Sequence, residues 1–311
     1  MELTMIPRLC AYAFVLSSLA LPSLAAAQDI QPAPAVGTEV FVSTDSDDTT
    51  ITRAALDLDV RNAGPANRLG IRLERAWYDL PAQQTETRNR VFLQFAQESE
   101  DWDFTARIGT DGDNVIGAIS VNDNSRFRKE VFVERDVVET PLGLDREIYS
   151  TFAGAAIDIP ADDRNIVTAL VGAQEFGGDN VRLHLRGNYV HVVDADLGIS
   201  AQLRGRYFHN SDPRELDYYS PRYFAQVLPV AQIRRFVNGW QLLAAGGIGI
   251  QRDSDSDWRQ SNFAQLRAIS PVRGPWSLSA EAIFSQTPGN SALAGEDYSY
   301  FQARLSATRR F

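Results

Sequence analysis

A histidine and a serine two residues apart, His209 and Ser211, form a pair whose residue types suit acyl transfer or lipid hydrolysis. A serine nucleophile needs a base within hydrogen-bond reach and a third group that orients the histidine. Glu215 or Asn188 is a candidate for that third group, although no spacing requires either one. Polar loop residues that follow a strand explain the pair equally simply, so a lipid hydrolase is carried only as an alternative.

A run of aspartates, DSDSDW at Asp253 to Trp258, invites comparison with a calcium loop. The helix–loop–helix calcium pattern needs glycine where Trp258 stands and a bidentate glutamate where Ala264 stands. The sequence also lacks a phosphate-binding loop, a dinucleotide fingerprint and a nucleophile elbow. Its histidines are dispersed: His184, His191 and His209. We therefore expect a solvated acidic loop, with no metal site and no cofactor.

Arginine is the most prominent side chain able to bind or sort charged solutes, because Lys129 is the only lysine. Many arginines alternate with apolar residues and are expected to share one interior face; they are Arg53, Arg68, Arg72, Arg107, Arg182, Arg186, Arg204, Arg206, Arg234, Arg267 and Arg304, with Arg310 at the end of the chain. Acidic residues join them on that face: Asp57, Asp59, Glu74, Asp103 and Glu281. These charges would either create the field of a pore or pair across the interior and fill it.

Extended strands must position these side chains, because apolar and polar residues alternate with period two over segments of about ten residues. The pattern is clear from Val181 to Val193, from Ile199 to His209 and from Phe301 to Phe311. Eight acidic and often longer connections alternate with seven others, one of which holds the tight-hairpin dipeptide Asn238-Gly239. This count predicts sixteen antiparallel strands and no second domain.

The alternation fits a membrane barrel better than a soluble β-sandwich, whose strands also alternate. Arginine recurs on the polar faces, which suits a wet interior, and aromatic residues near strand ends predict interface girdles. Those aromatic residues are Trp77, Trp102, Tyr149, Tyr189, Tyr207, Tyr223, Trp240 and Trp276. The predicted fold is all-β: one closed antiparallel transmembrane β-barrel of about sixteen strands, within roughly 12 to 18, over residues 28–311.

The first 27 residues read as a signal peptide that is cleaved. Arg8 precedes an apolar run, residues 9–21, and Ala25-Ala26-Ala27 supplies a small-residue cleavage site. The run is shorter than the ~20 residues that a membrane-spanning helix needs. Cys10 lies in this leader, so the mature chain is expected to contain no cysteine. A net charge of -10 argues against a nucleic-acid partner. Export to the outer membrane is the predicted localisation.

The stretch HNSDPRELDYYSPRYF, residues 209–224, resembles a known family through Asp217, Tyr218, Tyr219, Ser220 and Pro221. With the strands expected at residues 223–234 and 244–250, it is similar to the C-terminal barrel domains of exopolysaccharide-secretion porins, which include cellulose-secretion, poly-N-acetylglucosamine and YaiO-like outer-membrane proteins. The resemblance implies an outer-membrane channel for a saccharide polymer. Those exporters carry long helical repeats that this sequence lacks, so docking to a synthase is not implied. An ordered aromatic loop is the structural alternative.

The end of the chain, QARLSATRRF, resembles the C-terminal signal that outer-membrane barrels present to the barrel assembly machinery. Phe311 would be its terminal aromatic residue, while Arg309 departs from the pattern because it falls on the apolar side. The other expected partners are outer-membrane lipid and lipopolysaccharide, which acidic outer loops would contact through divalent ions. The expected function is passage of a polar or anionic solute, with exopolysaccharide as cargo. A structural or adhesive barrel with a blocked lumen is a further alternative.

Overall fold

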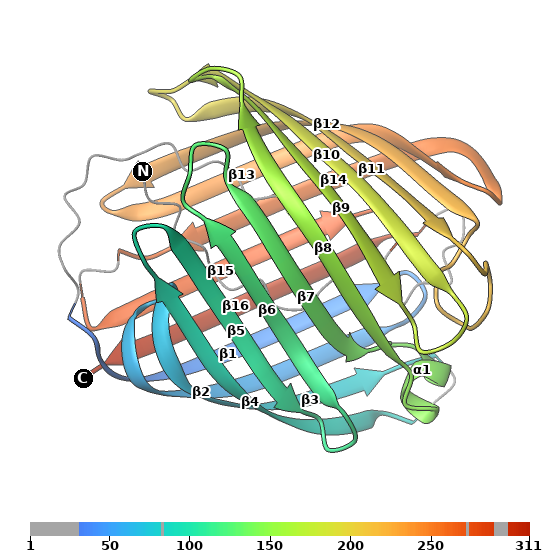
Figure 1. Ribbon diagram of the computed structural model, residues 1–311, viewed down its shortest axis with the longest axis horizontal. Helices are drawn as coiled ribbons and strands as arrows, with labels where there is room; N and C mark the ends of the chain where they lie inside the picture. The colour runs from blue at the N-terminus through green and yellow to red at the C-terminus, as the bar shows by residue number, and fades with distance from the viewer. Residues whose placement is uncertain (1–30, 82–83, 272–273, 289–297) are drawn as a thin grey trace.

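The computed structural model describes residues 31–81, 84–271, 274–288 and 298–311. Within them sixteen strands form one closed antiparallel barrel, in which each strand pairs with its sequence neighbours and β1 pairs with β16 (Figure 1). The strands are β1 (Ala33–Asp45), β2 (Thr50–Gly64), β3 (Asn67–Asp79), β4 (Glu86–Glu98), β5 (Trp102–Thr110), β6 (Val115–Asp123), β7 (Lys129–Val137), β8 (Tyr149–Pro160), β9 (Asn165–Glu175), β10 (Val181–Asp194), β11 (Ile199–Asn210), β12 (Tyr223–Val237), β13 (Trp240–Asp253), β14 (Ser256–Ile269), β15 (Trp276–Ser285) and β16 (Tyr300–Arg310). The predicted fold class and strand number are confirmed. The predicted signal peptide, residues 1–27, lies outside the described residues.

The first and last strands close the barrel without a break in register. Pairing runs continuously from Ala35 opposite Arg310 to Asp45 opposite Tyr300. A closed ladder pairs the backbone polar groups of every strand, which is the condition for a sheet to cross a lipid bilayer. The chain terminus at Phe311 and the short helix α1 (Pro141–Asp145) lie at opposite ends of the barrel (Figure 1). We call these the terminal end and the loop end.

Alternation places side chains on the two faces as the sequence predicts. On β10, Leu183, Leu185 and Tyr189 are exposed on the outer surface, whereas Arg182 and Arg186 are buried in the interior. At the predicted tight turn, Asn238 and Gly239 have φ of 52° and 84°, and Val237 pairs directly with Trp240. Positive φ at both central residues matches the twist of the flanking strands.

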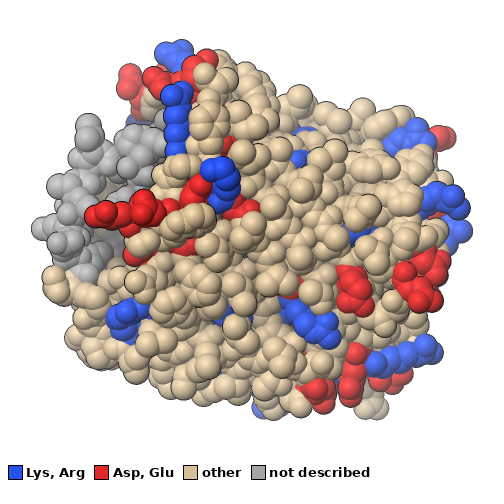
Figure 2. All heavy atoms as spheres, in the orientation of Figure 1, with Lys and Arg blue, Asp and Glu red and all other residues tan. Residues whose placement is uncertain are grey.

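The outer surface is apolar across the strands. Figure 2 shows a face on which charged side chains gather mostly towards the ends of the strands. Trp102, Tyr207 and Trp276 are exposed on this surface, as expected for girdle residues. Tyr149 differs from its prediction, because it is only 3% exposed and its hydroxyl donates to Asp111. Tyr149 instead packs in an apolar cluster with Tyr78, Phe92 and Leu144.

One short helix, α1 (Pro141–Asp145), interrupts the β-structure in the β7–β8 loop. Thr140 caps it by accepting a hydrogen bond from the backbone N–H of Gly143, and Pro141 opens its first turn. The sequence shows no helical periodicity here, because five residues are too few to display one. No helix among the described residues is long and apolar enough to cross a membrane.

The interior is not uniformly polar, which differs from the expectation of a purely wet face. Near β12 to β15 an apolar cluster lies inside the barrel; its members are Leu228, Val230, Leu243, Ala245, Phe263 and Ile283. A second cluster fills the loop end between β2 and β8 and includes Tyr78, Phe92 and Leu144. Packed side chains therefore occupy part of the space that the strand number alone would leave open.

Candidate functional site

Arginines on the first strands lie in a dense network of interior ion pairs. Arg72 on β3 donates from Nη2 to Glu39 Oε1 at 2.6 Å and from Nε to Glu74 Oε2 at 3.1 Å. Its Nη1 also lies 3.4 Å from Asp57 Oδ1. One guanidinium thus joins carboxylates from β1, β2 and β3. Buried charges need such partners, because an unpaired charge in the interior is strongly destabilising.

The same network continues along β4. Arg90 donates from Nη2 to Asp136 Oδ1 on β7 at 2.8 Å and to the Tyr78 hydroxyl at 2.8 Å. Arg68 lies 2.9 Å from Asp59. We call the interior side chains of β1 to β7 the paired wall. Arg68, Arg72 and Arg90 thus pair with carboxylates of the same wall.

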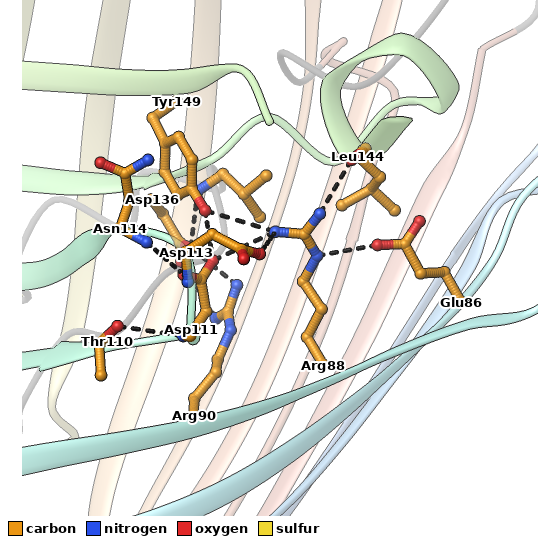
Figure 3. A network of polar contacts seen from close by, with 12 residues as sticks. Glu86, Arg88, Arg90, Thr110, Asp111, Asp113, Asn114, Asp136, Leu144 and Tyr149 are labelled. Atoms are coloured by element: carbon orange, nitrogen blue, oxygen red, sulfur yellow. Dashed lines mark hydrogen bonds and ion pairs between the residues drawn. The ribbon is translucent and has the colours of Figure 1, made fainter. Parts of the chain in front are cut away.

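A third group of contacts lies at the loop end (Figure 3). The guanidinium of Arg88 contacts Glu86 at 2.8 Å, Asp111 at 3.3 Å and the backbone carbonyl oxygen of Leu144 in α1 at 2.9 Å. The Tyr149 hydroxyl donates to Asp111 at 2.8 Å. Burial opposes ionisation of Asp111, but this hydroxyl and nearby backbone N–H groups outweigh it and lower its pKa. Asp111 therefore remains an ionised partner for Arg88.

The β7–β8 loop is anchored inside the barrel. Glu139 forms an ion pair with Arg53 on β2, and Leu144 packs into the apolar cluster of β2 to β8. On its other side, Asp217 of the β11–β12 loop accepts hydrogen bonds from the Thr140 hydroxyl at 2.6 Å and the Leu142 backbone N–H at 2.7 Å. We call residues 138–148 and 211–222 together the lid. It links β2 to β11 at the loop end.

The family-like motif of the β11–β12 loop has a structural role in the lid. Tyr218 stacks on Phe176 with ring centroids 4.2 Å apart, and the Tyr219 hydroxyl donates to Asp253 at 2.6 Å. Burial raises the pKa of both tyrosine hydroxyls, so they stay protonated donors. The Oγ of Ser220 accepts from the Arg214 backbone N–H, and the Pro221 carbonyl accepts from Asn210. The motif forms an ordered aromatic loop, and β12 begins two residues after Pro221.

Interior arginines of β10 and β11 have different surroundings. We call Arg182, Arg186, Arg204 and Arg206 the arginine wall. Arg204 donates from Nε and Nη2 to Gln202 Oε1 at 3.0 and 2.8 Å and lies over the ring of Phe263 at 4.7 Å. Arg206 lies over two aromatic rings, at 5.4 and 5.6 Å. Around Arg204 and Arg206, a neutral amide and aromatic rings therefore replace the carboxylates of the paired wall.

The remaining predicted arginines also face the interior. Arg107 lies over the Phe92 ring at 5.7 Å, and Arg304 lies 3.9 Å from Glu39. Arg234 and Arg267 each pair in register with Leu243 of β13, from its two neighbouring strands. Arg310 donates to the Gly274 carbonyl oxygen at the terminal end. The structure thus brings all the predicted arginines to one face, on which the paired wall and the arginine wall have different surroundings.

Several interior charges were absent from the sequence-based set. Arg88 and Arg90 alternate along β4 with the outward-facing apolar residues Val91 and Leu93. The alternation was therefore sufficient to predict that both arginines face the interior. Glu139 carried no such signal, because it lies in a loop. A small cavity of about 20 Å³ lies among the paired charges; its lining includes Glu39, Glu74, Asp136, Arg53, Arg72, Arg90, Arg107 and Arg304. Some free space therefore remains beside the paired wall.

The His209 and Ser211 pair shows no catalytic geometry. Both residues are exposed, and no hydrogen bond joins them in the described part of the chain. Ser211 Oγ instead accepts from the Val181 backbone N–H at 2.8 Å. Asn188 is buried in the interior, on the opposite face of the sheet from His209, and Glu215 accepts from the Tyr218 hydroxyl. The pair therefore lacks the oriented base that serine catalysis requires.

The acidic run at Asp253 is used within the protein. Asp253 lies 3.2 Å from Arg259 and accepts from Tyr219, and Asp255 forms an ion pair with Arg214. Among residues 31–81, 84–271, 274–288 and 298–311, no group of three or more potential metal-ligating side chains occurs. These aspartates stabilise the lid and the end of β13.

The last strand has the predicted register. Arg309 is exposed on the outer surface, where its guanidinium lies over Trp276 at 5.7 Å and over Phe311 at 5.1 Å. Gln302 and Arg304 face the interior on the other parity. Stacking between two aromatic rings explains how a cation is accommodated on the apolar face.

Comparison with solved structures identifies the fold. The chain is similar to a bacterial polysaccharide outer membrane secretin, with a TM-score of 0.67 and 10% identity over 91% of this chain and 100% of that chain. The chain has the fold of an outer-membrane β-barrel. The sequence predicted a resemblance to the barrel domains of exopolysaccharide-secretion porins, without their helical repeats. The structural similarity confirms this prediction for the fold.

Two further solved structures match the chain with lower TM-scores. Pseudomonas aeruginosa OccK5 (OpdH) matches with a TM-score of 0.44 and 8% identity over 90% of this chain and 98% of that chain. Vibrio cholerae OmpT, an outer membrane protein, matches with a TM-score of 0.42 and 9% identity over 88% and 98%. No protein-family model and no curated protein sequence matches this chain.

Proposed function

We propose that this protein is an outer-membrane channel that exports a polar or anionic solute, with a saccharide polymer as the cargo. The observation that carries the proposal is a closed barrel of sixteen described strands whose interior presents arginine from β2 to β16. A barrel of sixteen strands with charged interior side chains suits passage of hydrated solutes. The fold similarity to a polysaccharide outer membrane secretin supports the choice of cargo.

In this proposal the loop end faces the outside of the cell and the terminal end faces the periplasm. Residues 1–27 direct export, and Phe311 addresses the chain to the barrel assembly machinery. The lid then occupies the exit, because Glu139 and Leu144 tie the β7–β8 loop into the interior. The channel opens when this loop leaves the barrel, so wild-type openings are brief.

Planar-bilayer recording with the purified, refolded protein tests the proposal. Discrete conductance steps are expected, and liposomes containing the protein should swell in an oligosaccharide gradient. A variant that frees the β7–β8 loop gives a more decisive test, because its channel openings should last longer than those of the wild type. Absence of conductance and sugar flux from both the wild type and the lid variant, each shown to be folded, would leave a structural barrel with a blocked lumen.

A further inference from the structure

The two charged walls of the interior differ in how their arginines are neutralised. On the paired wall, Arg72 and Arg90 contact carboxylates at 2.6 and 2.8 Å. On the arginine wall, Arg186 of β10 and Arg206 of β11 are direct cross-strand partners in the register. Like charges directly opposite each other destabilise a sheet. In the described register of β1 to β7, no two arginines are direct cross-strand partners.

Arg204 and Arg206 show the difference most clearly. Among the described residues, neither has a carboxylate within ion-pair distance. Arg204 donates only to the neutral amide of Gln202, and the buried Nε of Arg206 has no hydrogen-bond partner in the same part of the chain. Their charges are therefore compensated by aromatic rings and amides rather than by anions.

The surroundings hold both guanidinium groups in place. Phe263 lies against Arg204, while Phe208 and Phe224 lie against Arg206. Phe208 and Phe224 are themselves stacked, with ring centroids 5.1 Å apart. A guanidinium that packs through its face keeps the N–H groups at its edge directed sideways, in the fork geometry that binds carboxylates and sulfates. The site is thus preorganised for an oxyanion.

We propose that Arg204 and Arg206 form a binding site for oxyanion substituents on the transported saccharide. This inference rests on the proposed function and names its substrate class, an acidic saccharide. Arg204 and Arg206 lie two residues apart on one strand, roughly 7 Å along it, so they can contact successive acidic groups of a polymer. Bound oxyanions supply Arg204 and Arg206 with the anionic partners that the described residues do not provide.

Calorimetric titration of the folded barrel in detergent tests the site without requiring passage. The probes are an oligogalacturonate, a sulfated oligosaccharide of similar length and a neutral maltooligosaccharide. We expect the barrel to bind the carboxylated or the sulfated probe and not the neutral one. Comparison of the Kd values for the two acidic probes shows which oxyanion is preferred. Equal binding of all three probes, or binding of none, would overturn the inference.

Two variants and a matched control assign the binding to these residues. Arg204→Gln combined with Arg206→Gln should raise the Kd for the acidic probe about tenfold or more, because charge-assisted hydrogen bonds are lost. Arg206→Lys alone keeps the charge but loses the fork, so an intermediate Kd is expected. Arg75→Gln removes an exposed arginine from the outer surface of β3 and should leave the Kd unchanged. Equal Kd values for the folded double variant and Arg75→Gln would refute the assignment.

Bilayer recordings separate this inference from the proposed function. Wild-type channels should be anion-selective and blocked by the acidic probe, and the double variant should lose both properties while still conducting. Conductance with unchanged selectivity and block in the double variant would reject the site and leave the channel. Binding without any conductance would reject the channel and leave the site.

Discussion

Glu139, in the loop after β7, forms an ion pair with Arg53 on β2, so this loop enters the barrel interior and reaches the far side of the paired wall. Asp136 and Arg90 also face Glu139. Burial raises the pKa of Glu139 above its ordinary value of 4.5, although Arg53 and Arg90 oppose the shift. The docked lid therefore binds the Glu139 proton more tightly than a lid in water.

We expect conductance to rise with pH because of this shift. The stabilisation of the docked lid by the proton on Glu139 is complete below the ordinary pKa and is lost as pH rises through the raised one. Channel openings should therefore lengthen as pH rises from below the ordinary value of 4.5 through the raised pKa of Glu139. Glu139→Gln mimics the protonated side chain, so its openings should be brief and independent of pH. Pore recordings across this range that show the same pH profile in both proteins would contradict the assignment to Glu139.

Asp217 should control the lid from its other side. Asp217→Ala removes the acceptor of the Thr140 hydroxyl and the Leu142 backbone N–H, which weakens docking of α1 by about 1 to 2 kcal/mol. That change corresponds to roughly a 5- to 30-fold increase in the ratio of open to closed states. Asp212→Ala, an exposed aspartate of the same loop, is the control and should leave the ratio unchanged. Matching open times in the two variants would show that Asp217 does not hold the lid.

Local patterns predict the strands well because each strand repeats its own signal. Leu183 faces outward and Arg182 faces inward, as period two requires, and Asn238-Gly239 forms the expected two-residue turn. The outward position of Arg309 confirms the register of the last strand. These features depend on residues within one hairpin, so a single sequence contains the information that specifies them.

Non-local pairing could not be predicted in the same way. Glu139 and Arg53 are 86 residues apart, and nothing in a period-two pattern indicates that a loop turns into the barrel. Leu242 and Leu243 are both apolar, although only Leu243 packs in the interior cluster, so alternation cannot assign the inward face there. The division into a paired wall and an arginine wall likewise depends on which strands approach one another around the barrel.

The two walls should respond differently to loss of one arginine. Arg90→Gln leaves Asp136 buried without its arginine partner and removes one of the two arginines that contact Glu74, so the free energy of unfolding should fall by about 3 to 5 kcal/mol. Arg206→Gln removes a cation that opposes Arg186, so the loss should be smaller than about 1 kcal/mol or should become a gain. Urea unfolding of the barrel in phospholipid vesicles, followed by tryptophan fluorescence, measures both. Similar losses would mean that the arginine wall stabilises the fold as the paired wall does.

The terminal aromatic residue should matter for assembly in cells rather than for stability. Phe311 is exposed at the end of β16 and contacts the Arg309 guanidinium, so Phe311→Ala removes little buried surface. We expect the variant to refold in detergent with the wild-type yield but to reach the outer membrane in severalfold lower amount, measured by heat-modifiable mobility of membrane fractions. Arg309→Gln keeps the aromatic end and is the control for loss of the stacked pair. Because Arg309→Gln retains Phe311, it should assemble like the wild type. An assembly defect equal to that of Phe311→Ala would show that assembly requires the contact between Arg309 and Phe311 and not the aromatic ring alone.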